Sequence, residues 1–340
     1  MVEKAILVLP YFGSFKGYFD LFLMSCSRLA SFDLLIVTDD DSPRDWPPNV
    51  FVERMPFEAF KGRVQSKFDF EISLERPYKL CDFKPAYGYI FEDAIRGYDY
   101  WGACDCDLLF GDLDALASPL MAAGYDKIFS AGHLTLYRND PENNRRFMRP
   151  CGEMGQIYRR ALSEPDSKVF DESYLCANVH RIFESDGCRM FEGDLSYDVS
   201  QIWEPPSRIE YDPPSHRWRE DNTLGELVFW ADGRVLGIRE ESGRLATRDY
   251  TYVHLQRRKM FMDGGELGAP AIWVRGDRFE SLEGLPGDLG EFRRMRSHSL
   301  QTIASVQQLK RFKFAMDSFS ERHRIPFSKK KPYWLNNPYA

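Results

Sequence analysis

The sequence is poor in the features that mark several common classes of protein. Its seven cysteines are odd in number and form no Cys-x-x-Cys pair, so we expect reduced, mostly buried thiols. No Gly-x-Gly-x-x-Gly follows the first apolar run, and a dinucleotide-binding fold is therefore not expected. No stretch is apolar over the length of a membrane span, and the run 5–9 is too short for a signal peptide. We expect a cytoplasmic protein.

Acidic residues outnumber basic ones in the sequence, except near the C-terminus. The 340 residues include 45 basic and 52 acidic side chains, a net charge of −7, which argues against a general nucleic-acid binder. Nine basic residues lie in 295–340, where only Asp317 and Glu321 are acidic. Apolar residues recur there at nearly helical spacing, and this predicts a basic amphipathic helix that either lies on an anionic membrane or packs on the protein. We treat 276–340 as a helical, basic extension of a domain spanning 1–275.

The rest of the sequence predicts an α/β fold. With 43% hydrophobic and 15% aromatic residues, the chain can bury one large core with appended elements. Apolar runs at 5–9 and 33–37 flank an amphipathic segment at 18–29, and this β-α-β order predicts a parallel sheet with a ligand crevice above the strand ends. Residues 85–95 read as a helix that leads into the next strand. Asp232-Gly233 predicts a tight hairpin turn.

Asp105 and Asp107 follow directly after an apolar run, 100–104, that reads as a buried strand. Side chains at positions i and i+2 leave a strand on the same side, so both carboxylates can face one object above the edge of the sheet. Two hard anionic oxygens suit Mg²⁺ or Mn²⁺, and a metal held in this way keeps open positions for a substrate diphosphate. The pattern indicates nucleotide-sugar transfer. The alternative is a pair of solvated loop carboxylates, because short acidic motifs are permissive.

Other polar residues at predicted strand ends are candidates for nucleotide binding. Two strand ends offer a place where a base and a ribose would bind across the sheet, with Asp39 as the best ligand. The residues concerned are Pro10, Tyr11, Thr38 and Asp39. The alternative is a pair of ordinary turns, with Asp39 as a helix cap or solvated charge. Lys84 directly precedes the helix predicted at 85–95, and a cation at the start of a helix is a phosphate-binding arrangement. The alternative is an ordinary surface lysine.

Four segments in a fixed order carry a resemblance to a known family. They are Asp105-Cys106-Asp107, 130–137 (Ser-Ala-Gly-His-Leu-Thr-Leu-Tyr), 170–175 (Phe-Asp-Glu-Ser-Tyr-Leu) and 252–255 (Tyr-Val-His-Leu). Together they resemble the GT-A glycosyltransferases of the glycogenin and bacterial lipooligosaccharide galactosyltransferase type. The set is also similar to glycosyltransferase-like proteins of bacterial capsule clusters. The resemblance extends over roughly Ala5 to Met260, and it implies a Rossmann-like mixed sheet flanked by helices.

The resemblance also implies roles for particular residues. In these families an Asp-x-Asp and a distant histidine bind manganese, and the matching positions are Asp105, Asp107 and His254. The chain departs from the family pattern at 130–132, where the family has Asn-Ala-Gly or Asn-Ser-Gly, and at Asp171-Glu172, where it has Asp-Gln. Both departures fall where contacts to the acceptor and the donor sugar are expected.

The chemistry of the residues around position 254 agrees with a metal and diphosphate site. His254 ends an aromatic-rich predicted strand, and an imidazole beside two carboxylates favours Mn²⁺ over Mg²⁺. The alternative is a hydrogen-bonded strand histidine without a ligand. Arg257 and Lys259 follow at once and supply cations where a diphosphate leaving group would lie, or else they form a solvated strand end.

Three further polar residues are expected to converge on the transferred hexose, namely His133, Asp171 and Glu172. His133 can equally be a core residue, and the two acidic residues can equally form the first turn of a helix. The resemblance implies retention of anomeric configuration, for which no dedicated base is obligatory. An inverting reaction would instead use Asp171 or Glu172 as its carboxylate base.

We therefore interpret the chain as a metal-dependent glycosyltransferase using Mn²⁺ or Mg²⁺. It would move a hexose from a nucleotide diphosphate sugar, by family expectation a uridine diphosphate (UDP) sugar, to a saccharide or lipid-linked acceptor in bacterial surface polysaccharide synthesis. The expected location is cytoplasmic, with peripheral contact at the inner face of the membrane. One rival is a haloacid-type phosphatase with Asp105 as nucleophile, which Leu108-Leu109 fit poorly. The other is a non-catalytic sugar- or metal-binding module.

Overall fold

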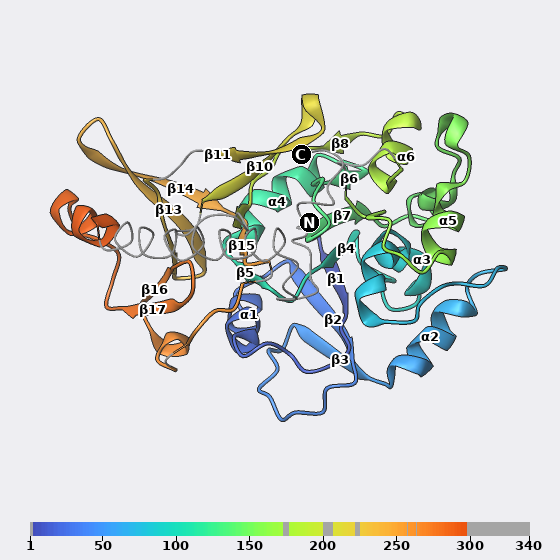
Figure 1. The fold of residues 1–340 in the computed structure, drawn as a ribbon, viewed down its shortest axis with the longest axis horizontal. Coiled ribbons are helices and arrows are strands. Elements are labelled where there is room, and N and C mark those ends of the chain that lie inside the picture. Colours follow the sequence, from blue (N-terminus) through green and yellow to red (C-terminus); the bar gives the residue numbers. More distant parts are fainter. Residues whose placement is uncertain are drawn as a thin grey trace, which may run out of the picture.

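The computed structural model describes residues 3–172, 177–199, 207–221, 225–256, 258–262 and 264–297. They form three β-sheets, with helices that cover the largest one (Figure 1). The predicted basic amphipathic helix and Arg257 lie outside the described residues. Among the described helices, none combines the length and the apolar character that a membrane crossing requires.

A seven-stranded mixed sheet forms the centre of the fold, in the order β3-β2-β1-β4-β7-β6-β8. Strands β1 to β4 are parallel, β7 runs antiparallel to β4 and β6, and β8 is parallel to β6. The strands are β1 Ala5–Pro10, β2 Phe32–Thr38, β3 Val50–Arg54, β4 Tyr100–Cys104, β6 Lys127–Ile128, β7 Leu134–Arg138 and β8 Met190–Phe191. The predicted α/β class with a mixed sheet is confirmed, and so is the β-α-β opening, in which α1 (Phe19–Cys26) joins β1 to β2.

The central strands of this sheet are buried at nearly every position, because both faces of the sheet are covered. Alternate residues of a strand face opposite sides, so Val8 joins one hydrophobic core while Leu7 joins the other. The first core includes residues of α2 Phe57–Gln65, α3 Tyr87–Ile90, α5 Ile157–Ser163 and α6 Val179–Ser185. The second includes residues of α1 and α4 Leu113–Ala122. Figure 1 shows α2, α3, α5 and α6 gathered on one side of the molecule.

The helix predicted at 85–95 is wrong in its bounds. Pro77–Ala86 form a 3₁₀-helix, η1, and only Tyr87–Ile90 continue as the α-helix α3. Pro85 lies inside the helical segment, where it has no N–H to donate and disfavours α-helical backbone at the preceding residue. The other 3₁₀-helices are η2 Asn143–Met148, η3 Gly152–Met154, η4 Pro213–Ser215 and η5 Glu266–Gly268.

Two five-stranded sheets complete the described fold. The second sheet has the order β11-β10-β9-β15-β5, and the third has the order β14-β13-β12-β16-β17. Their strands are β5 Leu108–Phe110, β9 Tyr197–Val199, β10 Arg208–Asp212, β11 Arg217–Asp221, β12 Leu227–Ala231, β13 Arg234–Glu241, β14 Arg244–Tyr250, β15 Tyr252–His254, β16 Ala271–Val274 and β17 Phe279–Leu282. The predicted hairpin is confirmed: Asp232 and Gly233 join β12 to β13 with φ values of 47° and 76°.

The strand predicted to end at His254 is in fact two strands of different sheets. β14 pairs with β13 in the third sheet, and β15 pairs with β5 and β9 in the second. Thr251 lies between them, and its backbone N–H donates to the Leu195 carbonyl instead of continuing the β13 ladder. The chain crosses between sheets at this residue, and the crossing carries His254 to the end of the central sheet.

The division at residue 275 stays a prediction. β17, which follows that position, pairs antiparallel with β16, which precedes it. A helix then runs through 289–297, and its Phe292 is buried against Phe229 and Trp273 of the third sheet. The part of the extension that the structure describes therefore packs on the third sheet.

Candidate functional site

Asp105 and Asp107 lie where β4 ends, and backbone bonds hold both residues in place. The Asp105 N–H donates to the His133 carbonyl at 3.0 Å, and the Asp107 carbonyl accepts the Leu255 N–H at 2.9 Å. Cys106 between them is buried, which leaves its neighbours to face outward. The Asp105 side chain is 35% exposed and that of Asp107 13%. Asp105-Cys106-Asp107, the acidic tip, is thus a fixed turn in which the Asp105 carboxylate is more exposed than the Asp107 carboxylate.

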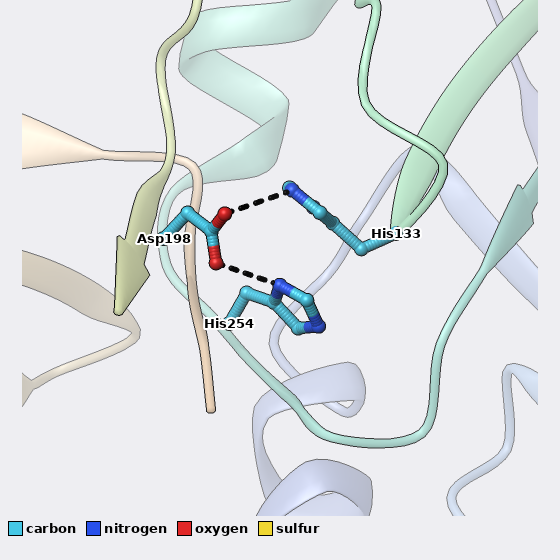
Figure 2. Close-up of side chains that lie close together, drawn as sticks. All are labelled: His133, Asp198 and His254. Carbon is cyan, nitrogen blue, oxygen red and sulfur yellow. Dashed lines mark hydrogen bonds and ion pairs between the residues drawn. The ribbon is translucent and has the colours of Figure 1, made fainter. Parts of the chain in front are cut away.

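Strand pairing brings His254 to this tip from far along the chain. β15 is antiparallel to β5, with His254 opposite Leu108, and parallel to β9, with His254 opposite Asp198. His254 Nε2 lies 3.5 Å from Asp107 Oδ1, and Nδ1 lies 2.8 Å from Asp198 Oδ1. Figure 2 shows the imidazole with Nδ1 turned to Asp198 and its other nitrogen turned away. Asp198 therefore orients the ring so that Nε2 faces the acidic tip.

His133 supports this arrangement from behind. Its ring stacks on His254 with the centroids 4.2 Å apart, and its Nδ1 is 2.8 Å from the Tyr252 hydroxyl. Its Nε2 points toward Asp198 Oδ2 at 3.7 Å, as Figure 2 shows, and has no hydrogen-bond partner among the described residues. Burial and the charge of His254 lower the pKa of His133 to about 3, so the ring is neutral. His133, which the sequence suggested for the hexose, is only 4% exposed here.

The charges of the site are strongly coupled. Burial disfavours charge on His254, but Asp198 and Asp107 outweigh it and raise the His254 pKa to about 10. Burial alone would raise the pKa of Asp107, yet His254 and the Lys16 ammonium hold that pKa far below its usual range. Burial also opposes ionisation of Asp198, and His254 again lowers the pKa. Without a metal, His254 is therefore a cation between two carboxylates.

Each carboxylate of the tip also contacts a lysine. Lys84 Nζ lies 2.7 Å from Asp105 Oδ1 and donates to the Gly132 carbonyl at 2.8 Å. Lys16 Nζ lies 2.8 Å from Asp107 Oδ2. These ammonium groups occupy the place next to the carboxylates that a cation would take.

Asp171 and Glu172 lie on the other side of Lys84. Asp171 Oδ2 is 3.4 Å from Lys84 Nζ, so that lysine links it to Asp105. A Cβ at Gly132 would lie 2.5 Å from Asp171 Oδ2, and this close approach requires glycine there. Burial, together with repulsion from neighbouring carboxylates, raises the pKa of Asp171 to about 6 and that of Glu172 to about 8, although the Lys84 ammonium lowers both. Neither residue belongs to the first turn of α6, which Asn178 caps instead.

The nucleotide candidates lie at the ends of β1 and β2. Pro10 ends β1 and Thr38 ends β2, and both are buried. Asp39 is exposed and accepts the Gly13 N–H at 2.7 Å. The Tyr11 ring stacks on Phe15 with the centroids 4.6 Å apart. These residues line the same sheet edge as Asp105, since β1 is parallel to both β2 and β4.

Lys259 is exposed in the segment after β15, and no contact with the acidic tip brings it to the site. Arg257 lies outside the described residues. Neither of the two cations predicted after His254 is therefore shown beside Asp105 or Asp107 in the described part of the chain. Lys84 contacts Asp105, and Lys16 contacts Asp107.

The residues fit a divalent cation. Asp105, Asp107 and His254 each offer a ligand atom, and these atoms lie within 4.8 Å of one another. Two carboxylate oxygens and one imidazole nitrogen form a donor set suited to Mn²⁺. A second group with the same spacing, His133, Asp198 and His254, shares the histidine, but its Nδ1 already bonds to Asp198.

Two residues of the site, Asp198 and Lys16, were not predicted from the sequence. Asp198 sits between Tyr197 and Val199 in β9, and a single charged residue within a short buried strand was its only signal. Lys16 lies just before α1, so it had the same signal as Lys84, a cation preceding a helix. Both act on the predicted ligands, Asp198 on His254 and Lys16 on Asp107.

Comparison with known proteins gives a family and a distant likeness. Residues 7–283 match the model of a family of unknown function, DUF6625. No curated protein matches the chain. Among solved structures, a galactosyltransferase, LgtC, in complex with donor and acceptor sugar analogues is 10% identical, with a TM-score of 0.31 over 57% of this chain and 75% of that one. The glycosyltransferase GlyE of Streptococcus pneumoniae TIGR4 is 12% identical, with a TM-score of 0.27 over 50% of this chain and 42% of that one.

Proposed function

The chain belongs to the DUF6625 family, whose function is unknown, and from its site we propose that it is a metal-dependent glycosyltransferase with a GT-A fold. The donor is a nucleotide diphosphate sugar, with uridine as the expected base, and the transferred group is a hexose. The acceptor is a saccharide or a lipid-linked saccharide of bacterial surface polysaccharide synthesis.

One observation carries this proposal: two carboxylates and one imidazole from distant parts of the chain converge at the end of a parallel strand. Asp105, Asp107 and His254 would hold Mn²⁺, or Mg²⁺, at the edge where α/β sheets bind ligands. The bound metal would supply positive charge to the diphosphate as it leaves. His254 has to lose its proton to become a ligand, and Asp198 keeps the remaining Nδ1–H pointed away from the metal side.

The chain's own residues would do the rest. Lys84 and the basic residues Arg257 and Lys259 supply further positive charge for the diphosphate. Pro10, Tyr11, Thr38 and Asp39 lie where a base and ribose would bind, beyond the metal along the same sheet edge.

Asp171 and Glu172 would face the hexose, with His133 as a supporting residue beneath it. Because their pKa values are raised, one of the two can carry a proton near neutral pH and donate a hydrogen bond to a sugar hydroxyl. The resemblance implies transfer with retention, in which the departing phosphate takes the acceptor proton and no dedicated base is required; in an inverting reaction Asp171 or Glu172 would be that base.

The division of labour along the chain is part of the proposal. Residues 1–275 would form the catalytic domain, and 276–340 a basic extension that contacts the inner face of the membrane from the cytoplasm. A lipid-linked acceptor would then meet the site at that surface.

Isothermal titration with uridine, guanosine, cytidine and thymidine diphosphates, with and without Mn²⁺, tests the proposal. The wild type is expected to bind one of them tightly and only with Mn²⁺, and Asp107→Ala is expected to lose that binding while it still folds. A wild type that binds none of the four contradicts the proposal. Phosphate release from simple phosphoesters that Asp105→Asn alone abolishes would favour the phosphatase instead.

A further inference from the structure

Lys16 occupies an unusual place in the loop between β1 and α1. Its Nζ donates to Asp107 Oδ2 at 2.8 Å and to the Gln256 carbonyl at 3.1 Å, so it links the acidic tip to the segment after β15. The Lys16 side chain is 36% exposed, whereas that of Asp107 is 13% exposed. One side of the ammonium is therefore bound to the protein and the other is open.

The loop that carries Lys16 is pinned on both sides of the lysine. The Gly13 N–H donates to Asp39 Oδ1 at 2.7 Å, and the Phe15 N–H donates to Asp40 Oδ2 at 3.1 Å. The Phe15 ring also stacks on Phe19 of α1, with the centroids 3.8 Å apart. The backbone at Lys16 is thus fixed, while the end of its flexible side chain has several positions within reach.

A divalent cation on Asp107 and an ammonium on the same carboxylate repel each other. With a cation held by Asp107, Lys16 would lose its main partner, and the pinned loop would keep its ammonium beside the added positive charge. The anionic oxygens of a diphosphate bound there would be strong acceptors for that ammonium.

Lys84 is a less suitable candidate for such an exchange. Its side chain is only 12% exposed, and its Nζ contacts Asp105, Asp171 and the Gly132 carbonyl together. If the cation takes Asp105, Lys84 still keeps two anionic or carbonyl partners. Lys16 would keep the Gln256 carbonyl and the face of the Tyr18 ring, whose centroid lies 5.5 Å from its Nζ, but no anionic partner.

We propose that Lys16 is a diphosphate-binding residue. In the empty site its ammonium donates to Asp107, and when cation and donor bind the ammonium turns to a phosphate oxygen instead. The inference rests on the proposed function, because it needs a cation on Asp107 and a diphosphate next to it. It adds a residue of the β1–α1 loop to the donor site, and it assigns that residue opposite effects on the two ligands. Lys16 competes with the cation and supports the diphosphate.

Titration calorimetry on the full chain separates these two effects. The wild type, Lys16→Gln and Lys16→Arg are each titrated with Mn²⁺ alone and, at saturating Mn²⁺, with inorganic pyrophosphate and with uridine. Lys16→Gln is expected to bind Mn²⁺ several-fold more tightly, because the competing ammonium is gone. It is expected to bind pyrophosphate about tenfold more weakly, the usual effect of losing one charge-assisted hydrogen bond. Uridine affinity stays the same, and Lys16→Arg restores most of the pyrophosphate affinity.

Lys61→Gln is the matched control. Lys61 of α2 makes an ion pair of 2.9 Å with Glu75, so the variant changes net charge equally and leaves the site intact. It is expected to match the wild type in all three titrations. If Lys16→Gln does not fold, Lys16→Met takes its place, because it keeps the length of the apolar stem.

The outcomes distinguish the inference from the proposed function. A Lys16→Gln variant that binds pyrophosphate like the wild type, or that binds Mn²⁺ more weakly, makes Lys16 a structural contact of Asp107 and overturns the inference alone. A wild type that binds neither Mn²⁺ nor UDP overturns the proposed function and the inference with it.

Discussion

Two lysine–aspartate ion pairs have nearly equal distances between nitrogen and oxygen but differ strongly in their exposure to solvent. Lys79 and Asp82 are 2.7 Å apart with side chains 1% and 0% exposed, and Lys16 and Asp107 are 2.8 Å apart with side chains 36% and 13% exposed. Lys79 Nζ also donates to the carbonyls of Ala161 and Asp166. The closed pair uses its whole hydrogen-bonding capacity inside the protein, whereas the open pair keeps capacity for a ligand.

The partners of each aspartate explain the difference. Asp82 accepts the backbone N–H groups of Lys168 and Phe170, so it fixes the loop that leads to Asp171. Among the described residues, the Asp107 carboxylate instead contacts two side chains that can move away or lose a proton, Lys16 and His254. Residue type and distance therefore do not distinguish the two pairs. The exposure of the side chains and the other partners of each aspartate do.

The largest effect on folding is expected at the closed pair. Asp82→Ala leaves a buried ammonium and two backbone N–H groups without their acceptor, and it should lower the free energy of unfolding by about 3–5 kcal/mol. Urea denaturation followed by circular dichroism measures this. The double variant Lys79→Met/Asp82→Ala should recover part of the loss. A cost no greater than that of Asp107→Ala would erase the contrast between the pairs.

The open pair is expected to behave in the opposite way. Asp107→Ala should weaken Mn²⁺ binding by at least about 100-fold, more than the loss of a residue that only supports a ligand. It should lower the metal-free unfolding free energy by less than Asp82→Ala does, because Lys16 is partly exposed and can turn to solvent while His254 keeps Asp198. Calorimetric titration and urea denaturation of the same sample give both numbers, and a destabilisation as large as that of Asp82→Ala would contradict the assignment.

Asp198→Asn sharpens the comparison, because Asp198 is not one of the three predicted metal ligands and bonds to His254 and Gln256. The amide can no longer stabilise the oriented imidazole as the carboxylate does, and Mn²⁺ affinity should fall about 10- to 100-fold. Asp198→Glu should restore part of the affinity if the carboxylate itself is required. Equal Mn²⁺ affinity in wild type and Asp198→Asn, measured by titration, would remove Asp198 from the site.

The pH dependence of the metal-free protein tests the charge on His254. Its pKa is raised from 6.5 to about 10, so its contribution to stability is complete below pH 6.5 and is lost as the pH rises toward 10. The unfolding free energy of the wild type should fall by at least about 1 kcal/mol across this window. His254→Asn should show a flatter profile, and identical profiles would exclude a charged His254.

The smallest effect is expected at an exposed pair of similar length. Lys61 and Glu75 are 2.9 Å apart with side chains 26% and 69% exposed. Lys61→Gln should leave the unfolding free energy close to that of the wild type, because solvent screens such a pair. Urea denaturation of this variant supplies the baseline against which the closed and open pairs are judged.

Much of the framework could be predicted because its signals are local. Asp232-Gly233 can adopt positive φ and so marks the hairpin between β12 and β13. The apolar run of β4 bounded by Asp105 marks a buried strand and its end. The helix expected at 85–95 was wrong in its bounds, because Pro85 lies inside a 3₁₀-helix that begins at Pro77 instead of starting an α-helix.

The site was only partly predictable because its geometry comes from pairing between distant strands. No local pattern shows that β9 lies parallel to β15, yet that pairing sets Asp198 beside His254. In the same way, nothing near Lys16 shows that its side chain reaches Asp107. Composition marks the candidates, and long-range register decides which of them meet.

The pairing of β5 with β15 also sets the order in which the molecule is assembled. Asp107 is made early in synthesis, and His254 only after the strands β12, β13 and β14 have followed. Closing so long a loop is slow, and its entropic cost is recovered only when the late strand docks. The central sheet can therefore form while the site is still incomplete. Protection of the Leu255 amide, which donates to the Asp107 carbonyl, would report that last step in a hydrogen-exchange experiment.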